Sequence, residues 1–296
     1  MIEIKGLSHS LGKKTVLTGI DLTLPDDTVL GIVGINGAGK STLLRLLSGV
    51  YVADAGSILF DGAPPTDAAT RQSIFYLPDD PYYDAQTTPS SLFRFYETLY
   101  PTVDRAAYTA LLSEYQISEN GKLRNFSKGM RRQVFIALAL AVKPKYLLLD
   151  EAFDGLDPLS RKIFKDAIIT WIEENGGTVL ITSHSLRELE DFCDRFILID
   201  AHEIREQGDI AEHVGKLCKF ELAFAEQADA TLFRDLPTVS LSIRGKFVGI
   251  VLRGDSDAMR EKLSLLSPLV MEEFALDFEE AFIYDVERNR GEAHAK

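Results

Sequence analysis

Gly34-Ile35-Asn36-Gly37-Ala38-Gly39-Lys40-Ser41 fits G-x-x-x-x-G-K-[ST], the pattern of a phosphate-binding loop. An apolar run before it, Thr28–Val33, predicts a buried strand, and Thr42–Ser48 after it predicts a helix. In that context the glycines let successive backbone N–H groups surround a β-phosphate, and the helix N-terminus adds a favourable dipole. Lys40 supplies a charge to the β- and γ-phosphates, and the Ser41 hydroxyl is a ligand for Mg²⁺. The stretch therefore predicts a bound nucleoside triphosphate; a glycine-rich turn that binds nothing is the alternative.

Composition limits the class of protein. The 296 residues, 46% of them hydrophobic and 26% charged, suffice for one large or two modest folded domains. The longest apolar run, Val134–Val142, is too short to cross a bilayer, and Met1–Lys5 lacks a secretory signal pattern. Cys193 and Cys218 lack metal or redox spacing. Together these features predict a cytosolic protein. The net charge of −13 argues against a general nucleic-acid surface, so we expect no nucleic-acid partner.

The phosphate-binding loop alone does not choose among kinases, GTPases, helicases and transport ATPases, but a second acidic motif narrows the choice. Lys145–Glu151 reads as a buried parallel strand that ends in two acids, at the edge where ligands bind in such sheets. Asp150 is placed to hold the Mg²⁺ shell. Glu151 is placed to orient and deprotonate an attacking water. Without the upstream loop, the same pair would read as a solvated strand end.

Four further motifs follow in a fixed order, and together with the loop they resemble the ATP-binding-cassette (ABC) ATPases over residues 1–215. Asn125–Gln133 resembles the signature motif of that family, Asp154–Pro158 its D-loop and Ile181–Ser185 its switch histidine, while Ser73–Asp79 stands at its Q-loop. The resemblance implies an α/β fold. It comprises a P-loop cassette with a mixed core sheet and flanking helices, an antiparallel β subdomain, and a helical subdomain at about 80–142. A small α+β domain over 216–296 completes the prediction.

The resemblance also implies roles for individual residues. The catalytic residues are Glu151, His184 and Lys40. The nucleotide is held by Asn36, Gly37, Ala38, Gly39, Lys40, Ser41, Thr42, Leu11, Ser127, Gly129 and Asp157. The ligands of Mg²⁺ are Ser41, Asp79 and Asp150.

Two of these roles have local alternatives. Ser127 and Gly129 precede a helix over Met130–Ala141, and such an N-terminus is an anion site. The resemblance implies that it meets the γ-phosphate on an opposite subunit, so that two chains enclose two ATP molecules head to tail. Ser127 also suits the cap of its own helix. His184 is expected to bridge Glu151, water and phosphate; a lone histidine after a strand is otherwise structural or solvated.

Three motifs depart from the family pattern. The signature reads Phe-Ser-Lys-Gly-Met where Leu-Ser-Gly-Gly-Gln is commoner, which adds the cation Lys128. Asp79 replaces the glutamine of the Q-loop; a carboxylate still ligates Mg²⁺ but has a shorter reach. Leu11, with His9 nearby, stands where the family stacks adenine on an aromatic ring, so we expect a merely apolar contact with the base.

The order of predicted elements supports the cassette. The alternation in Ile2–Lys5 and Val16–Leu24 predicts half-buried strands. After the acidic strand the chain returns to strands and helices in turn: helix Ser160–Glu174, strand Thr178–Ile181, helix Ser185–Phe192 and strand Arg195–Asp200. Beyond residue 215 the patterns predict strands Phe220–Ala225, Val239–Ile243 and Phe247–Leu252, the last two as a hairpin, and helices Asp255–Leu265 and Asp277–Asp285.

Aromatic residues gather in the helical subdomain. Ten of the 28 Phe, Tyr and Trp residues lie between Phe75 and Tyr115. The same region of ABC transporters receives a coupling helix of the membrane subunit, and aromatic side chains are favoured at protein contacts. We expect Tyr82, Tyr83 and the Phe93–Tyr96 face to be partly exposed, although most of the ten rings should pack the subdomain.

Two classes of function remain. The favoured one is the ATPase motor of a membrane transporter, in particular a bacterial exporter, because the C-terminal stretch Phe278–Tyr284 resembles the ABC-2-type exporter group. Its partners are a second ABC ATPase subunit, as homodimer or heterodimer, and a separate multi-span permease that holds the motor at the cytoplasmic face of the membrane. The alternative is an ABC ATPase acting on ribosomes or DNA. A P-loop kinase would leave the signature and His184 without a role.

Overall fold

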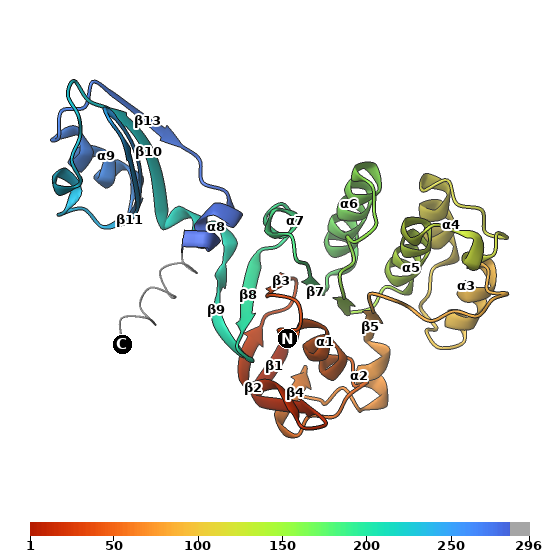
Figure 1. Cartoon of the computed structure of the whole chain (residues 1–296). Helices are drawn as coiled ribbons and strands as arrows, with labels where there is room; N and C mark the ends of the chain where they lie inside the picture. The colour runs from red at the N-terminus through yellow and green to blue at the C-terminus, as the bar shows by residue number, and fades with distance from the viewer. Residues whose placement is uncertain (285–296) are drawn as a thin grey trace. The chain divides into compact units, whose positions relative to one another are not determined.

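The structure is a computed structural model, which describes residues 1–284 and has the mixed α/β fold predicted from the motifs (Figure 1). Contacts divide the chain into two compact units, Met1–Gln207 and a second unit that begins at Gly208. Helix α8 (Ile210–Gly215) therefore belongs to the second unit. The sequence-based prediction included this helix in the first domain, which it ended at residue 215. Val214 of this helix packs with Leu217 and Val251 of the second unit, which explains the earlier boundary.

A six-stranded sheet forms the centre of the first unit. Its order is β5-β6-β7-β3-β8-β9, and the first five strands pair in parallel. Every residue of β3, β6 and β7 is buried, as expected of parallel strands covered on both faces. The carboxyl ends of the parallel strands consequently lie at one edge. The strands are β3 (Val29–Val33), β5 (Ile74–Leu77), β6 (Tyr146–Leu149), β7 (Thr178–Thr182), β8 (Arg195–Asp200) and β9 (Glu203–Asp209).

A second, antiparallel sheet of the first unit has the order β2-β1-β4. It consists of β1 (Ile2–Leu11), β2 (Lys14–Leu24) and β4 (Ala55–Phe60). The two strands predicted near the N-terminus are confirmed, but β1 continues to Leu11. Its pairing with β2 shifts register between Ile4 and His9, and such irregularities break the alternation by which a strand is recognised.

The helical subdomain begins later than predicted. Residues 80–88 are not helical, and α3 starts where Thr88 caps it and Pro89 takes the first position. Figure 1 shows α3, α4 and α5 grouped together beside β5. The helices of the first unit are α1 (Lys40–Leu47), α2 (Ala68–Gln72), α3 (Pro89–Glu97), α4 (Arg105–Glu114), α5 (Lys128–Val142), α6 (Pro158–Asn175) and α7 (Leu186–Glu190), with a 3₁₀ turn at Leu123–Asn125.

The predicted exposure of the aromatic cluster is only partly right. Tyr82 is 91% exposed and Phe95 is 59% exposed, as expected. The prediction is wrong for Phe93, which is buried with its ring centroid 5.1 Å from that of Tyr108 on α4. None of the helices within residues 1–284 combines the length and apolar character needed to cross a bilayer.

The second unit is a four-stranded antiparallel sheet of order β11-β12-β10-β13, and the predicted β11–β12 hairpin is confirmed. The predicted Asp277–Asp285 helix is present over 278–284, while Asp285 lies outside the described residues. β13 was not predicted, because most of its residues are exposed and its sequence, Val-Met-Glu-Glu-Phe, does not alternate between apolar and polar residues. The remaining elements are β10 (Leu217–Ala223), β11 (Thr238–Arg244), β12 (Phe247–Arg253), β13 (Val270–Phe274), α9 (Ser256–Ser264) and a 3₁₀ turn at Ala230–Phe233.

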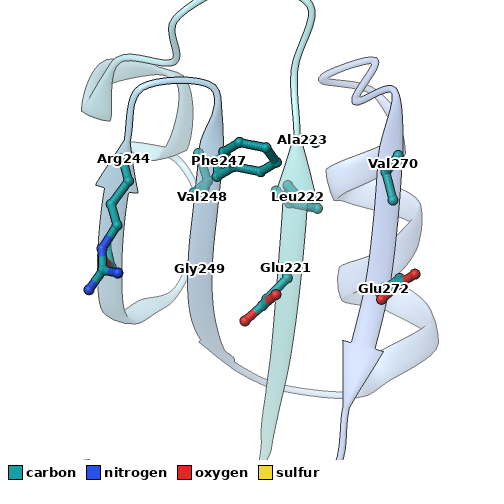
Figure 2. A pocket seen from close by; sticks show the side chains of 10 residues that line it. Glu221, Leu222, Ala223, Arg244, Phe247, Val248, Gly249, Val270 and Glu272 are labelled. Atoms are coloured by element: carbon teal, nitrogen blue, oxygen red, sulfur yellow. The ribbon is translucent and has the colours of Figure 1, made fainter.

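The two faces of this sheet differ. Phe220 points to the face that packs on Met259 and Leu263 of α9, where it is fully buried. The other face carries a hollow of about 660 Å³ (Figure 2). Phe247, which lines this hollow, is 68% exposed. The hollow is lined by Glu221, Leu222, Ala223, Ser242, Arg244, Phe247, Val248, Gly249, Val270 and Glu272.

The two faces predict losses of stability of very different size for the same substitution, Phe to Ala. Phe220→Ala should lower the free energy of unfolding of the second unit by about 3–5 kcal/mol, because it leaves a core cavity. Phe247→Ala, the matched control on the open face, should change it by less than about 0.5 kcal/mol. Urea unfolding followed by circular dichroism measures both, while fluorescence of Trp171, the single tryptophan, follows the first unit. Equal losses in the two variants would contradict the assignment of the core face.

Candidate nucleotide-binding site

The predicted phosphate-binding loop connects β3 to α1, and its conformation requires glycine at the helix cap. Gly39 has φ 113°, and a Cβ there would lie 2.7 Å from Leu17 Cδ2 and 3.0 Å from the Val16 carbonyl oxygen. Only glycine lets the loop lie this close to β2. Lys40 begins α1 with its side chain 6% exposed, and Nζ donates to the Gly34 carbonyl oxygen at 2.7 Å. The ammonium group is thus held at the loop rather than in solvent.

Asp150 receives hydrogen bonds at the carboxyl edge of the central sheet. Its side chain follows β6, is almost fully buried, and accepts at Oδ1 from Ser41 Oγ (2.9 Å) and Thr182 Oγ1 (2.8 Å). Tyr76 of β5 donates a longer hydrogen bond to Oδ2 at 3.4 Å. Burial, with the charge of Asp150 as a second cause, raises the pKa of Tyr76 to about 12, so this hydroxyl remains a donor at neutral pH. Side chains from three elements, α1, β5 and β7, therefore donate to one carboxylate.

Glu151 has an unusual backbone conformation that directs its carboxylate. Its φ is 49°, in the left-handed region that non-glycine residues rarely adopt, and its N–H donates to Thr182 Oγ1 at 2.8 Å. Oε1 lies 3.7 Å from Lys40 Nζ, and Oε2 lies 3.0 Å from His184 Nδ1. The structure thus brings together five residues predicted for catalysis, phosphate or metal: Lys40, Ser41, Asp150, Glu151 and His184.

The signature residues form a second group at the N-terminus of α5. Ser127 caps the helix, with Oγ accepting from the Met130 N–H at 3.1 Å, so the capping interpretation is confirmed. A Cβ on Gly129 would lie 2.5 Å from the carbonyl oxygen of Gly155, so the close approach of these two segments requires glycine. Asp157 caps α6 by accepting from two backbone N–H groups.

Lys128, the cation that departs from the family pattern, joins this second group. Its Nζ lies 2.5 Å from Asp154 Oδ2 and 3.8 Å from Asp79 Oδ1. The hydrogen bond from Lys128 lowers the pKa of Asp154, and the same bond raises the pKa of Lys128. Both groups are consequently charged at neutral pH. This pair ties the first turn of α5 to the segment that precedes Asp157.

Asp79 and Leu11 make other contacts than the predicted ones. The Asp79 carboxylate, predicted to ligate Mg²⁺, accepts from Arg132 Nη2 at 2.7 Å. Leu11 is exposed at the end of β1, where it pairs with Lys14, and the neighbouring ring of His9 stacks on Tyr51 instead. Within the loop, Asn36 and Gly37 are exposed, whereas Ala38 and Thr42 are buried.

Sequence reasoning missed three residues that contact the predicted ones: Tyr76, Arg132 and Thr182. Thr182 was recognisable in principle. β6 and β7 are neighbouring parallel strands with Leu149 opposite Ile181, so the next residue of each, Asp150 and Thr182, must be adjacent. Arg132 carries no such signal, because its partners come from distant parts of the chain.

Comparisons with known proteins agree with this geometry. A family model described as "ABC transporter" matches residues 17–154. The ABC transporter ATP-binding protein YtrB of Bacillus subtilis (strain 168) is 30% identical over 285 residues, which cover 96% of this chain and 97% of YtrB. The chain belongs to the ATP-binding subunits of ABC transporters. This ABC ATPase is also 33% identical over 218 residues to the lipopolysaccharide export system ATP-binding protein LptB of Haemophilus influenzae, which covers 70% of the chain and 90% of LptB.

A solved structure of an ATP-binding subunit of an ABC transporter superposes with a TM-score of 0.66 at 26% identity, covering 72% of this ABC ATPase and 91% of that chain. The predicted cassette fold, ATP binding and ATPase activity are therefore confirmed at the level of the family.

Thr182 provides a direct test of the site's geometry. Thr182→Val removes the acceptor of the Glu151 N–H, so we expect a loss of about 1–3 kcal/mol in stability. We also expect a fall in kcat of about tenfold or more, because Glu151 loses its orientation.

The control is Thr178→Val at the other end of β7. Thr178 Oγ1 is one of the buried polar atoms within residues 1–284 that have no hydrogen-bond partner, so its removal should be close to neutral for stability and turnover. Thermal unfolding and steady-state ATP hydrolysis measure both variants. Similar behaviour of the two valine variants would contradict the assigned contacts of Thr182.

Proposed function

We propose that this ABC ATPase is the ATP-hydrolysing motor of a membrane exporter. The supporting observation is the division of its site residues into two groups. Lys40, Ser41, Asp150, Glu151 and His184 lie at the edge of the central sheet, whereas Ser127 and Gly129 lie at the N-terminus of α5. A helix N-terminus favours an anion, so a nucleotide on one chain is completed by the signature residues of another. The active species is then a head-to-tail homodimer or a heterodimer with a related subunit.

The proposed reaction uses the contacts within the first group. Lys40 exchanges its hydrogen bond with the Gly34 carbonyl for the β- and γ-phosphates of ATP. Glu151 accepts a proton from the attacking water, and His184 holds the second carboxylate oxygen in place. The nucleotide favours the closed dimer, and hydrolysis with phosphate release favours reopening. The difference in nucleotide affinity between the closed and the open dimer sets the free energy that is available to move a partner.

Mg²⁺ fits the chemistry of the residues around Ser41. The hydroxyl of Ser41 and the carboxylate of Asp150 are hard oxygen donors that lie 2.9 Å apart. Within residues 1–284 no group of three or more His, Cys, Asp or Glu side chains is placed to hold a metal ion. Ser41 and Asp150 would therefore hold Mg²⁺ together with oxygens supplied by the nucleotide and by water. When bound, the ion neutralises charge that develops on the phosphates.

The exporter and its permease are inferred from the relatives. LptB is by name the ATP-binding protein of an export system, and YtrB is an ABC transporter ATP-binding protein. By analogy we place the transmembrane segments on a separate multi-span permease and the motor at the cytoplasmic face of the membrane. The exposed rings of Tyr82 and Phe95 are candidates for contact with that permease.

Glu151→Gln tests the motor mechanism. Without a general base, turnover should fall by about 10²–10⁴-fold while ATP still binds. Because the closed state then persists, size-exclusion chromatography with ATP should show dimers. Glu174→Gln, the same change on an exposed residue of α6, serves as the matched control. A Glu151→Gln protein that hydrolyses ATP at the wild-type rate would exclude the assigned base; one that stays monomeric with ATP would exclude the sandwich.

Affinity capture of the Glu151→Gln protein from detergent-solubilised membranes of the source cell tests the partner. We expect co-purification of a protein with several membrane spans, in stoichiometric amounts and increased by ATP. Recovery of ribosomes or DNA in its place would favour the alternative class of ABC ATPase.

A further inference from the structure

Arg132 is a buried cation that joins α5 to the edge of the central sheet. Its side chain is 2% exposed, and Nη1 donates to the Pro78 carbonyl oxygen at 3.0 Å. Nη2 donates both to the carbonyl oxygen of Asp79, at 2.6 Å, and to its carboxylate, at 2.7 Å. Nη1 also lies 3.5 Å from the carbonyl oxygen of Asp150. One guanidinium therefore contacts the chain just after β5 and just after β6.

A buried guanidinium requires a counter-charge, because arginine does not lose its proton in proteins. Asp79 supplies the nearest carboxylate, and the half-exposed side chain of Asp79 also lies 3.8 Å from Lys128 Nζ. The Asp79 Oδ1 oxygen is thus committed to two cations of α5. This contact explains why a short acid, rather than a longer neutral side chain, suits the position opposite Arg132.

The Asp150–Glu151 peptide group is contacted on both sides. Its carbonyl oxygen faces Arg132, and its N–H donates to Thr182 at 2.8 Å. This peptide precedes the left-handed φ of 49° at Glu151, a conformation that persists only where surrounding contacts enforce it. The same conformation directs the Glu151 carboxylate toward Lys40 and His184. Fixing this peptide group consequently fixes the direction of the carboxylate.

We propose that Arg132 is a positioning residue for Glu151, and that Asp79 acts as the counter-ion that keeps Arg132 in place. The inference rests on the proposed role of Glu151 as general base. Asp79, the acid at the Q-loop position, then acts within its own chain. Through Arg132 it holds the N-terminal part of α5 against the strand ends that are followed by Asp150 and Glu151.

Arg132→Lys tests the positioning role while keeping the positive charge beside Asp79. Lysine lacks the planar fork that reaches several carbonyl oxygens at once. We expect kcat to fall by about 10–100-fold, as for a small misplacement of a catalytic group, with the KM for ATP and the Mg²⁺ concentration for half-maximal rate unchanged. Arg94→Lys, on an exposed arginine of α3, is the matched control. Wild-type kcat in a folded Arg132→Lys protein, or a fall only in its Tm, would overturn the proposal.

Asp79→Asn separates a counter-ion from a metal ligand. A counter-ion predicts a lower Tm and a lower kcat. The double variant Asp79→Asn/Arg132→Gln should partly restore the Tm, because the buried charge and its partner are removed together, whereas its kcat should stay low because the positioning guanidinium is lost. A metal ligand predicts instead a raised Mg²⁺ requirement in Asp79→Asn, without rescue, and that result would overturn the inference. Failure of the general-base assignment would be recognised separately, by normal turnover in Glu151→Gln.

Discussion

Thr182 Oγ1 lies 2.8 Å from Asp150 Oδ1 because β6 and β7 pair in parallel with Leu149 opposite Ile181. On its other side β7 pairs with β3, with Ile32 opposite Thr182, so the loop that follows β3 begins at the same level. Three segments far apart in the sequence therefore present a phosphate-binding loop, two acids and a hydroxyl at one edge. A slip of one residue between β6 and β7 would turn these side chains to the opposite face of the sheet. Register, more than any single hydrogen bond, brings Ser41 within reach of Asp150.

The parts of the site that could be predicted from sequence are those whose geometry is local. A glycine-rich turn between strand and helix positions Lys40 and Ser41 whatever the rest of the chain does, and an acid directly after a buried strand emerges at the ligand-binding edge. Contacts that depend on tertiary packing were missed. Arg132 lies in the first turns of a helix, where an arginine is most often solvated, and only folding shows that it faces Pro78 and Asp79. Phe93 was assigned to a surface for the same reason, since the neighbouring Tyr108 lies on another helix.

Charge is balanced locally around the site in spite of the net −13 of the chain. Glu151 lies near Lys40, Asp79 near Arg132, and Asp154 near Lys128. In each of these three pairs the nitrogen and the oxygen lie within 3.7 Å, the longest of the three separations. The buried carboxylate of Asp150 is held instead by the hydroxyls of Ser41 and Thr182. Lys40, the cation that we propose for the phosphates, is held by a neutral carbonyl and by an acid at a longer distance. Moving Lys40 to phosphate consequently breaks one hydrogen bond to a neutral group and leaves the other ion pairs intact.

The left-handed backbone conformation of Glu151 is strained, and contacts of the surrounding residues offset this strain. Strain of this kind amounts to about 1–3 kcal/mol. A correctly oriented general base accelerates a reaction by about 10²–10⁴-fold, which corresponds to about 2.7–5.4 kcal/mol of barrier height. The catalytic gain exceeds the strain only if the conformation is kept through the cycle, and a single contact worth about 1 kcal/mol would not keep it. Two contacts on opposite sides of the same peptide group, the hydroxyl of Thr182 and the guanidinium of Arg132, together offset strain of this order. Because Arg132 extends from α5, the proposed positioning of the Glu151 carboxylate depends on where that helix lies, so in this proposal the helix that carries the signature residues also orients the base of its own chain.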